Sequence, residues 1–225
     1  MKKKSINIEK AQNNIVNQGI LPLYFHKEAY ISLEILRAVY SAGIKAVEYT
    51  NRGDAAFTNF KAMVALRDES MPDLMLGIGT IKNLTQAKMY REVGADFIVS
   101  PGLIPEVAGY CVENDIFHTP GCMTPSEIIA AENAGIGFIK LFPGNLLGPE
   151  FLSSIRDIFP KLMFMPTGGV DVTHESIKSW FDAGVSAVGM GSKLITKTLM
   201  DNKDYSTIEE EIKKVLDIIK SIQKA

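Results

Sequence analysis

Short apolar runs recur along the chain at intervals of roughly 20 to 30 residues, and the segments between them have apolar positions at helical spacing. The clearest helical stripe is Ile31, Ile35, Leu36 and Val39. The runs are short and mostly apolar rather than strictly alternating, which is typical of parallel strands buried on both faces. The eight predicted strands are residues 20–25, 46–50, 74–80, 97–100, 116–119, 137–142, 162–167 and 187–190.

Helix boundaries agree with this reading. Thr124-Pro125-Ser126-Glu127 combines a capping hydroxyl, a proline at the first helical position and an acid in the first turn, which predicts a helix start. Glycines stand where the intervening helices should end, at Gly43, Gly94, Gly135 and Gly184. Two further helices are predicted outside the repeating units, over residues 5–18 and 206–224.

The repeating units predict an α/β fold. Eight strand–helix units within about 200 residues favour a (β/α)8 TIM barrel with an extra N-terminal helix, smaller than the usual barrel of about 250 residues. We expect residues 1–225 to form a single domain, with no room for a second catalytic domain. The alternative is an open doubly wound sheet. The barrel is favoured because the units repeat without a change of pattern.

Composition narrows the class of protein. The chain has 225 residues, of which 46% are hydrophobic and 22% charged, with a net charge of -2. A disordered chain would have fewer apolar residues and a larger net charge. A dedicated nucleic-acid binder would have a strong excess of basic residues. The sequence has no run of roughly 18 apolar residues, so we expect no membrane span. The basic start is not followed by the apolar segment of a signal peptide. The two cysteines, Cys111 and Cys122, fit a reduced cytosol, so we expect a cytoplasmic protein.

Lys140 lies inside an otherwise apolar predicted strand. Phe138, Lys140 and Phe142 share one face of that strand. If Ile139 and Leu141 pack against the outer helices, Lys140 points into the barrel. Burial would lower the pKa of its amine, and a neutral amine can condense with a ketone to form a Schiff base. The alternative is a lysine at a strand end that extends to solvent.

Glu48 occupies a similar position, in the second predicted strand. That strand lies opposite the sixth in an eight-stranded barrel, so Glu48 and Lys140 can face each other in one layer. A carboxylate beside a Schiff-base lysine can move protons, whereas the alternative is a buried ion pair with a structural role. Arg52 follows at the loop, where its guanidinium suits a carboxylate ligand, although an isolated arginine is more often a surface residue.

Glycine-rich segments follow the last two predicted strands. Gly168-Gly169 and Gly191-Ser192 would bring backbone N–H groups close to an anion, at the place where barrels frequently bind phosphate. The alternative is that these glycines only form tight turns. Metal ligation is not expected, because His26, His118 and His174 are isolated. Cys122 is not expected to be a nucleophile, because its loop has no marked base partner.

Together, the strand ends resemble the 2-keto-3-deoxy-6-phosphogluconate (KDPG) / 4-hydroxy-2-oxoglutarate (KHG) aldolase family. The resemblance covers nearly the whole chain. Its most specific parts are the spacing from Glu48 to Arg52 and the Lys140-Leu141-Phe142-Pro143 segment. It is carried by residues 47–52, 77–80, 100–102, 120–121, 139–143, 166–169 and 189–192.

The resemblance implies a trimeric (β/α)8 barrel and a class I aldolase without a cofactor or metal. Lys140 matches the lysine that forms the Schiff base with pyruvate, and Glu48 matches the general acid/base. The pyruvate side is matched by Arg52, Thr80, Pro101, Phe142 and Thr167, and the phosphate segment by Gly168, Gly169, Gly191 and Ser192. The expected partners are a small 2-keto acid substrate and two further copies of the chain, with no nucleic acid and no membrane.

The chain also departs from the family pattern. Leu141-Phe142-Pro143-Gly144-Asn145 replaces a frequent Phe-Phe-Pro-Ala-Glu, and Asn51-Arg52-Gly53 replaces Leu-Arg-Thr. These changes bear on the aldehyde side of the substrate. Two other functions remain open at this point. One is a sugar-phosphate isomerase or epimerase, which needs no Schiff-base lysine, and the other is a non-catalytic sugar-acid binding protein.

Overall fold

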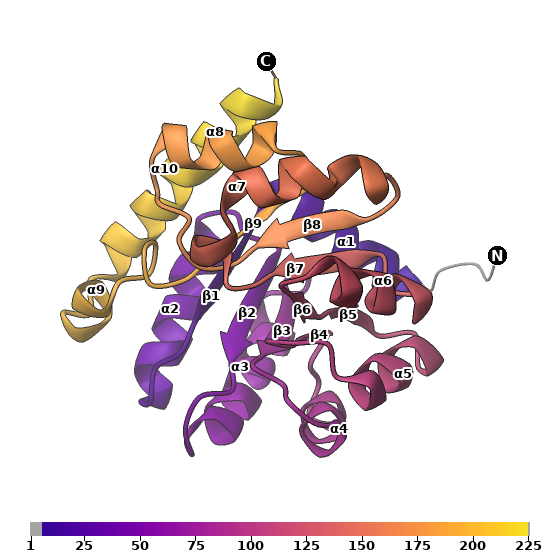
Figure 1. The fold of residues 1–225 in the computed structure, drawn as a ribbon. Coiled ribbons are helices and arrows are strands. Elements are labelled where there is room, and N and C mark those ends of the chain that lie inside the picture. The colour runs from indigo at the N-terminus through magenta and orange to yellow at the C-terminus, as the bar shows by residue number, and fades with distance from the viewer. Residues whose placement is uncertain (1–5, 225) are drawn as a thin grey trace.

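Parallel strands alternate with helices through a computed structural model that describes residues 6–224 (Figure 1). The strands are β1 (Ile20–Tyr24), β2 (Ala46–Thr50), β3 (Met75–Gly79), β4 (Phe97–Val99), β5 (Phe117–Thr119), β6 (Gly121–Cys122), β7 (Phe138–Leu141), β8 (Met163–Pro166) and β9 (Val188–Met190). The helices are α1 (Ile6–Gln18), α2 (Ala29–Ser41), α3 (Ala56–Ser70), α4 (Leu84–Glu92), α5 (Pro105–Glu113), α6 (Pro125–Asn133), α7 (Gly144–Ile155), α8 (His174–Asp182), α9 (Lys197–Asp201) and α10 (Tyr205–Gln223), with a 3-10 turn, η1, at Arg156–Ile158.

The strands close on themselves. One set runs in the order β5-β4-β3-β2-β1-β9, so the last strand pairs with the first, and a second set runs β6-β7-β8. A bridge between Thr167 and Gly189 joins β8 to β9, and Gly121 N donates to Ser100 O at 2.9 Å on the other side. The predicted (β/α)8 barrel is therefore confirmed, and the open doubly wound sheet is excluded.

Pro120 explains the division of the fifth barrel strand into β5 and β6. Proline has no backbone N–H and cannot complete the ladder on both sides. Its carbonyl still accepts from Lys140 N at 3.0 Å, so the strand direction continues past the break. The predicted strand ends at Thr119, so Gly121 and Cys122 lie outside the prediction.

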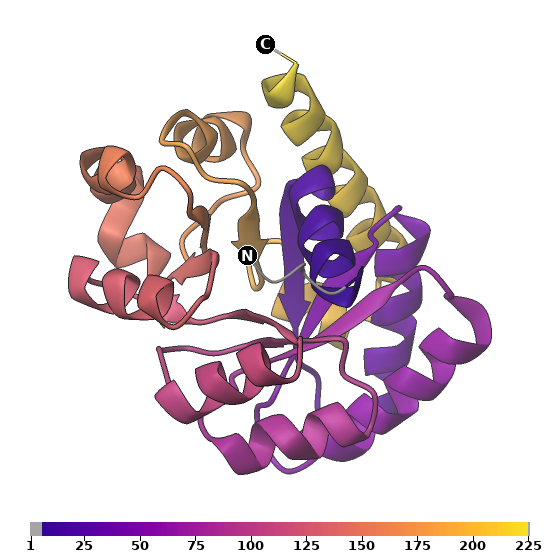
Figure 2. The ribbon, with the colours of Figure 1, turned by 90° about the vertical axis from the view of Figure 1, so that its right-hand side faces the viewer.

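Two apolar clusters fill the fold on either side of the strands. Ile139 and Leu141 belong to the large cluster between the strands and the outer helices, which follow one another around the barrel in Figure 2. A smaller cluster lies inside the barrel and includes Phe138, together with Ala11 and Ile15 of α1. The N-terminal helix therefore closes the barrel interior at the end where the strands begin. The buried polar residues lie toward the carboxyl ends of the strands.

Most predicted boundaries are found within one or two residues. Thr124 and Glu127 form a reciprocal capping box at the start of α6. Each of the four predicted helix-ending glycines has a positive φ, at Gly43, Gly94, Gly135 and Gly184. The predicted start of the first helix, at Ser5, lies outside the described residues. The pattern did not reveal α9 or the kink of α7 at Gly148. None of the described helices combines the length and the apolar character that a membrane crossing requires.

Candidate active site

The strand registers decide which residues share a level inside the barrel. In an eight-stranded barrel of this kind, inward residues of alternate strands form layers. The observed pairings place Glu48, Val99, Lys140 and Gly189 in one layer, which borders the apolar cluster of Phe138 and shares Val99 with it. Glu48 on β2 and Lys140 on β7 therefore lie on opposite sides of the same layer.

Both charged groups of this layer are buried. Lys140 is 5% exposed and Glu48 is 1% exposed. Burial lowers the pKa of Lys140, and Arg52 lowers it further, while the Glu48 carboxylate opposes the shift. Burial raises the pKa of Glu48, against the opposite influence of Lys140 and Arg52. Each group is thus shifted toward its neutral form, which gives the amine nucleophilic character and the carboxyl group the ability to donate a proton.

Gly79 provides the space for the Glu48 carboxyl group. A Cβ atom at Gly79 would lie 1.7 Å from Glu48 Oε1 and 2.5 Å from Cδ. The other carboxyl oxygen, Oε2, is buried without a hydrogen-bond partner among the described residues. An unpaired buried carboxyl oxygen is expensive unless a ligand or water meets it. The Glu48 carboxyl group therefore keeps a hydrogen-bonding position that the described residues leave unfilled.

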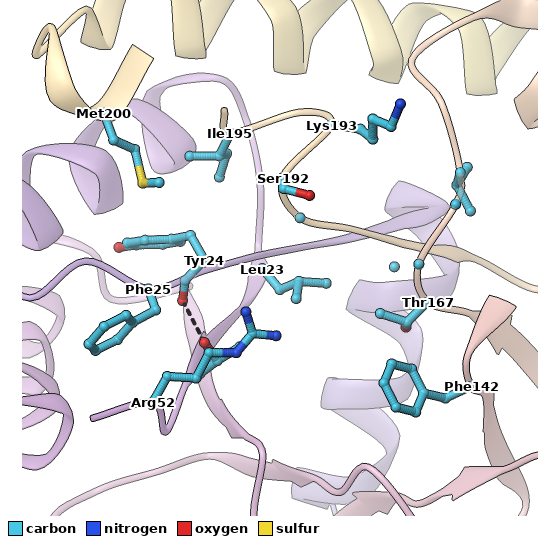
Figure 3. A pocket seen from close by; sticks show the side chains of 16 residues that line it. Leu23, Tyr24, Phe25, Arg52, Phe142, Thr167, Ser192, Lys193, Ile195 and Met200 are labelled. Carbon is cyan, nitrogen blue, oxygen red and sulfur yellow. Dashed lines mark hydrogen bonds between the residues drawn. The ribbon is translucent and has the colours of Figure 1, made fainter. Parts of the chain in front are cut away.

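A pocket of about 240 Å³ lies above this layer (Figure 3). Seven of the predicted site residues line it: Arg52, Phe142, Thr167, Gly168, Gly169, Gly191 and Ser192. Lys140 lies beneath, with its ammonium group 4.9 Å from the centre of the Phe142 ring. The Thr167 hydroxyl is buried and has no hydrogen-bond partner within residues 6–224. Residues predicted for the pyruvate side and residues predicted for the phosphate therefore border the same pocket, above Lys140.

Two predicted residues lie at the edge of this arrangement. Pro101 and Thr80 are not part of the pocket lining, and both are half-buried. By register Pro101 shares the uppermost layer with Phe142. Thr80 follows β3 with a φ of 62°, a left-handed conformation that is a genuine outlier for a β-branched residue. Such strain persists only where the surroundings impose it, and it is common near active sites.

The glycine-rich loops expose backbone to the pocket. Gly168 and Gly169 both have positive φ, at 92° and 76°. A Cβ atom at Gly169 would lie 2.4 Å from Asn145 Cβ, so the chain can pass α7 only with glycine at this position. The consequence is that two successive backbone units border the pocket without side chains, beside Ser192 from the loop after β9.

The pocket also contains residues that the sequence reading did not select. Leu23, Tyr24, Thr50 and Lys193 line it, as do Phe25, Val170, Gly189, Ile195 and Met200. Lys193 directly follows the predicted Ser192, so its position in the sequence was a usable signal. The contribution of Gly79 had no such signal, because it depends on the packing of β2 against β3.

The remaining titratable candidates are not arranged for catalysis. Cys111 and Cys122 are buried free thiols, and burial raises the pKa of each to about 12. His118 is buried, with Nε2 3.0 Å from Ser100 Oγ, and burial lowers its pKa to about 3. Within residues 6–224, no group of three or more His, Cys, Asp and Glu side chains could hold a metal ion.

Comparison with known proteins agrees with this geometry. Among curated proteins, the 2-dehydro-3-deoxy-phosphogluconate aldolase of Haemophilus influenzae is 28% identical over 202 residues, which cover 89% of this chain and 92% of that protein. The enzyme of the same name from Treponema pallidum is 31% identical over 69% of this chain and 72% of its own length.

Solved structures give the same result. The KDPG aldolase of Legionella pneumophila, solved with pyruvate captured at low pH as a covalent carbinolamine intermediate, has a TM-score of 0.83 and 26% identity. The similarity covers 91% of this chain and 97% of that one. A sequence model described as KDPG and KHG aldolase matches residues 12–211. The chain therefore belongs to the KDPG and KHG aldolase family.

Proposed function

We propose that the protein is a class I aldolase that cleaves 2-keto-3-deoxy-6-phosphogluconate to pyruvate and glyceraldehyde 3-phosphate. The same chemistry extends to 4-hydroxy-2-oxoglutarate, which yields pyruvate and glyoxylate. The observation that carries the proposal is the buried Lys140, whose pKa is lowered by burial and which lies in one layer with Glu48 beneath an open pocket. Membership of the aldolase family supports the reaction class.

The first stage forms the Schiff base. The neutral Lys140 amine attacks the 2-keto carbon of the substrate and forms a carbinolamine. Because the pKa of Glu48 is raised by burial, its carboxyl group can deliver the proton with which the carbinolamine hydroxyl leaves as water. The product is an iminium ion, which provides the electron sink for the next stage, so the reaction needs no further cofactor.

The second stage breaks the carbon–carbon bond. Glu48, now a carboxylate, removes the proton from the C4 hydroxyl, directly or through a water molecule. The C3–C4 bond breaks, its electron pair moves into the iminium to give an enamine, and the aldehyde leaves. Protonation at C3 and hydrolysis of the resulting iminium release pyruvate and regenerate the Lys140 amine.

The pocket residues are assigned to the two ends of the substrate. We propose that Arg52 and Thr80 hold the pyruvate carboxylate, and that Phe142, Pro101 and Thr167 form the walls around the reacting carbons. The phosphate is bound by the backbone N–H groups of Gly168, Gly169 and Gly191 and by the backbone N–H and hydroxyl groups of Ser192. Arg52 and the glycine-rich loops border the same pocket, which supports binding of a substrate with an anionic group at each end.

The assignment is tested by pyruvate release from the phosphogluconate substrate, with lactate dehydrogenase as the coupling enzyme. The wild-type protein should release pyruvate, and Lys140→Met should lower kcat to the background rate. A Lys140→Met protein with full activity would contradict the mechanism and favour an isomerase or epimerase. The activity of the wild-type protein on phosphorylated and unphosphorylated substrates then tests the phosphate site. If the protein shows no preference for the phosphorylated substrate, the role assigned to the glycine-rich loops is wrong.

We also propose that the protein is a homotrimer. Large apolar side chains are exposed on neighbouring elements, including Val112 of α5, Met123 before α6 and Ile129 of α6. An apolar groove there is lined by Leu103, Ala108 and Val112, together with Ala130 of α6 and Ala134 directly after it. We expect Ile129→Glu to shift the mass measured by light scattering from trimer to monomer. A wild-type monomer would contradict the trimer, and an unchanged Ile129→Glu trimer would contradict this interface.

A further inference from the structure

The pocket has a second charged residue that has no assigned role. The charged residues in its lining are Arg52 and Lys193. Figure 3 shows them apart, with Arg52 on the lower side and Lys193 beyond Ser192 on the upper side, where its ammonium group points away from the centre of the pocket. A substrate with a carboxylate at one end and a phosphate at the other would therefore have a cation at each end.

Lys193 is paired across the two loops. Its ammonium lies 2.9 Å from the Asp171 carboxylate, so it connects the loop after β9 to the loop after β8. The two side chains are 59% and 51% exposed. An ion pair with this exposure contributes little free energy, because water competes for both charges. The Lys193 side chain is long and flexible, so Lys193 can exchange Asp171 for another anion without a change in the backbone.

The backbone of Asp171 is hydrogen-bonded to a residue of α8. Its backbone N–H donates to Ser176 Oγ at 3.1 Å, near the start of α8. Thr173 caps the same helix, since its side chain accepts from Ser176 N. Asp171 does not line the pocket, whereas Lys193 does. When a ligand arrives, Lys193 is the member of the pair that can turn into the pocket.

We propose that Lys193 binds the substrate phosphate directly, and that the phosphate displaces Asp171 as its partner. A phosphate monoester carries a charge of about -1.5 to -2 at neutral pH, against -1 for the Asp171 carboxylate. Its oxygens would meet the ammonium beside the Ser192 hydroxyl and the backbone of Gly168 and Gly169. Lys193 is thus a specificity-determining residue for phosphorylated substrates. This inference rests on the proposed aldolase function.

The test measures kcat and KM of Lys193→Met with phosphorylated and unphosphorylated 2-keto-3-deoxy acids. Loss of one charge-assisted contact should raise the KM of the phosphorylated substrate by about tenfold and leave kcat nearly unchanged. The unphosphorylated substrate should keep its wild-type KM. A KM within about twofold of wild type for the phosphorylated substrate, or an equal rise for both substrates, would overturn the proposal.

A double variant separates direct binding from simple charge balance. If Lys193 only neutralises Asp171, then Asp171→Asn should restore the KM of Lys193→Met, and that result would overturn direct binding. If Lys193 binds phosphate, the double variant should keep a raised KM, and Asp171→Asn alone should lower the KM of the phosphorylated substrate. Lys178→Met is the matched control, because Lys178 forms a similarly exposed pair with Asp182 on α8 and does not line the pocket.

The same proteins distinguish failure of this inference from failure of the proposed function. Pyruvate has no phosphate, so borohydride reduction in its presence should label Lys140 at the same rate in the wild-type and Lys193→Met proteins. Labelling without any change in substrate preference would overturn the role of Lys193 alone. Absence of labelling in the wild-type protein would instead overturn the Schiff-base mechanism.

Discussion

Gly79 offers a way to displace the Glu48 carboxyl group without changing a single ionisable residue. A Cβ atom at this position would lie 1.7 Å from Glu48 Oε1, whereas ordinary contacts begin at 3.4 Å. In Gly79→Ala the carboxyl oxygen must therefore move by about 1.7 Å, the difference between these distances. The φ angle of Gly79 is not positive, so the alanine backbone itself is not strained.

The expected effect on catalysis is large. A misplacement of about 1 Å can lower a rate by about 100-fold, and complete loss of a general acid/base costs about 10² to 10⁴. We therefore expect kcat of Gly79→Ala to fall by about 100-fold or more, which corresponds to about 2.7 kcal/mol in the activation free energy. The assay is steady-state pyruvate release, read together with the free energy of unfolding from urea titration.

Stability should change little in this variant. The added methyl group of Gly79→Ala would meet the Glu48 side chain from Cγ outward and no backbone atom among its three nearest contacts, so the side chain can rotate away and we expect a loss within about 1 kcal/mol. Gly77→Ala is the matched control on the same strand and the same inward face. There the Cβ atom would lie 2.1 Å from the ring of Phe97, which is fully buried in the barrel interior.

The two variants should thus have opposite profiles. Gly77→Ala should lose about 1 to 3 kcal/mol of stability through overpacking, with a smaller effect on kcat. Gly79→Ala should keep its stability and lose activity. If Gly79→Ala retained wild-type kcat, the placement of Glu48 against β3 would not matter for the reaction, and the acid/base assignment would be refuted.

The charge environment of Lys140 leads to three further predictions. The rate of borohydride inactivation with pyruvate should increase with pH through the pKa of Lys140, at a pH below the ordinary lysine value of 10.5, because burial lowers that pKa; a transition at or above 10.5 would contradict a buried amine. Glu48→Gln should move this transition to lower pH and Arg52→Met to higher pH, since the carboxylate raises and the guanidinium lowers the pKa of Lys140; the opposite directions would contradict the electrostatic account. Finally, the double variant Glu48→Gln/Lys140→Met should have a free energy of unfolding in urea that equals the wild-type value or exceeds it by about 1 to 4 kcal/mol. The reason is that burial of the two groups costs more hydration free energy than their mutual attraction provides. A clear loss of stability would show that the pair has a structural role.

Periodicity was sufficient for the framework of this fold. The strand at Ala46–Thr50 was predicted with its observed bounds, because an apolar run with β-branched residues lies between helix-type segments. The opposition of Glu48 and Lys140 followed from barrel geometry, which relates the faces of alternate strands without any further information. The features that were missed are those that local pattern does not contain.

Four examples show the limit. The five-residue helix α9 is too short to have a visible period. The strand β6 begins after Pro120, beyond the predicted strand end at Thr119. The space that Gly79 leaves for Glu48, and the reach of Lys193 to Asp171, depend on contacts between segments that are distant in the chain or belong to different loops. Such contacts are set by packing and not by spacing.

Borohydride trapping with pyruvate tests the central claim most directly. The protein is incubated with pyruvate, reduced and digested, and the modified peptide is identified by mass spectrometry. We expect one reduced pyruvate adduct, located on Lys140 and absent from Lys140→Met. An unmodified Lys140, or an adduct of equal yield on another lysine, would contradict the Schiff-base mechanism.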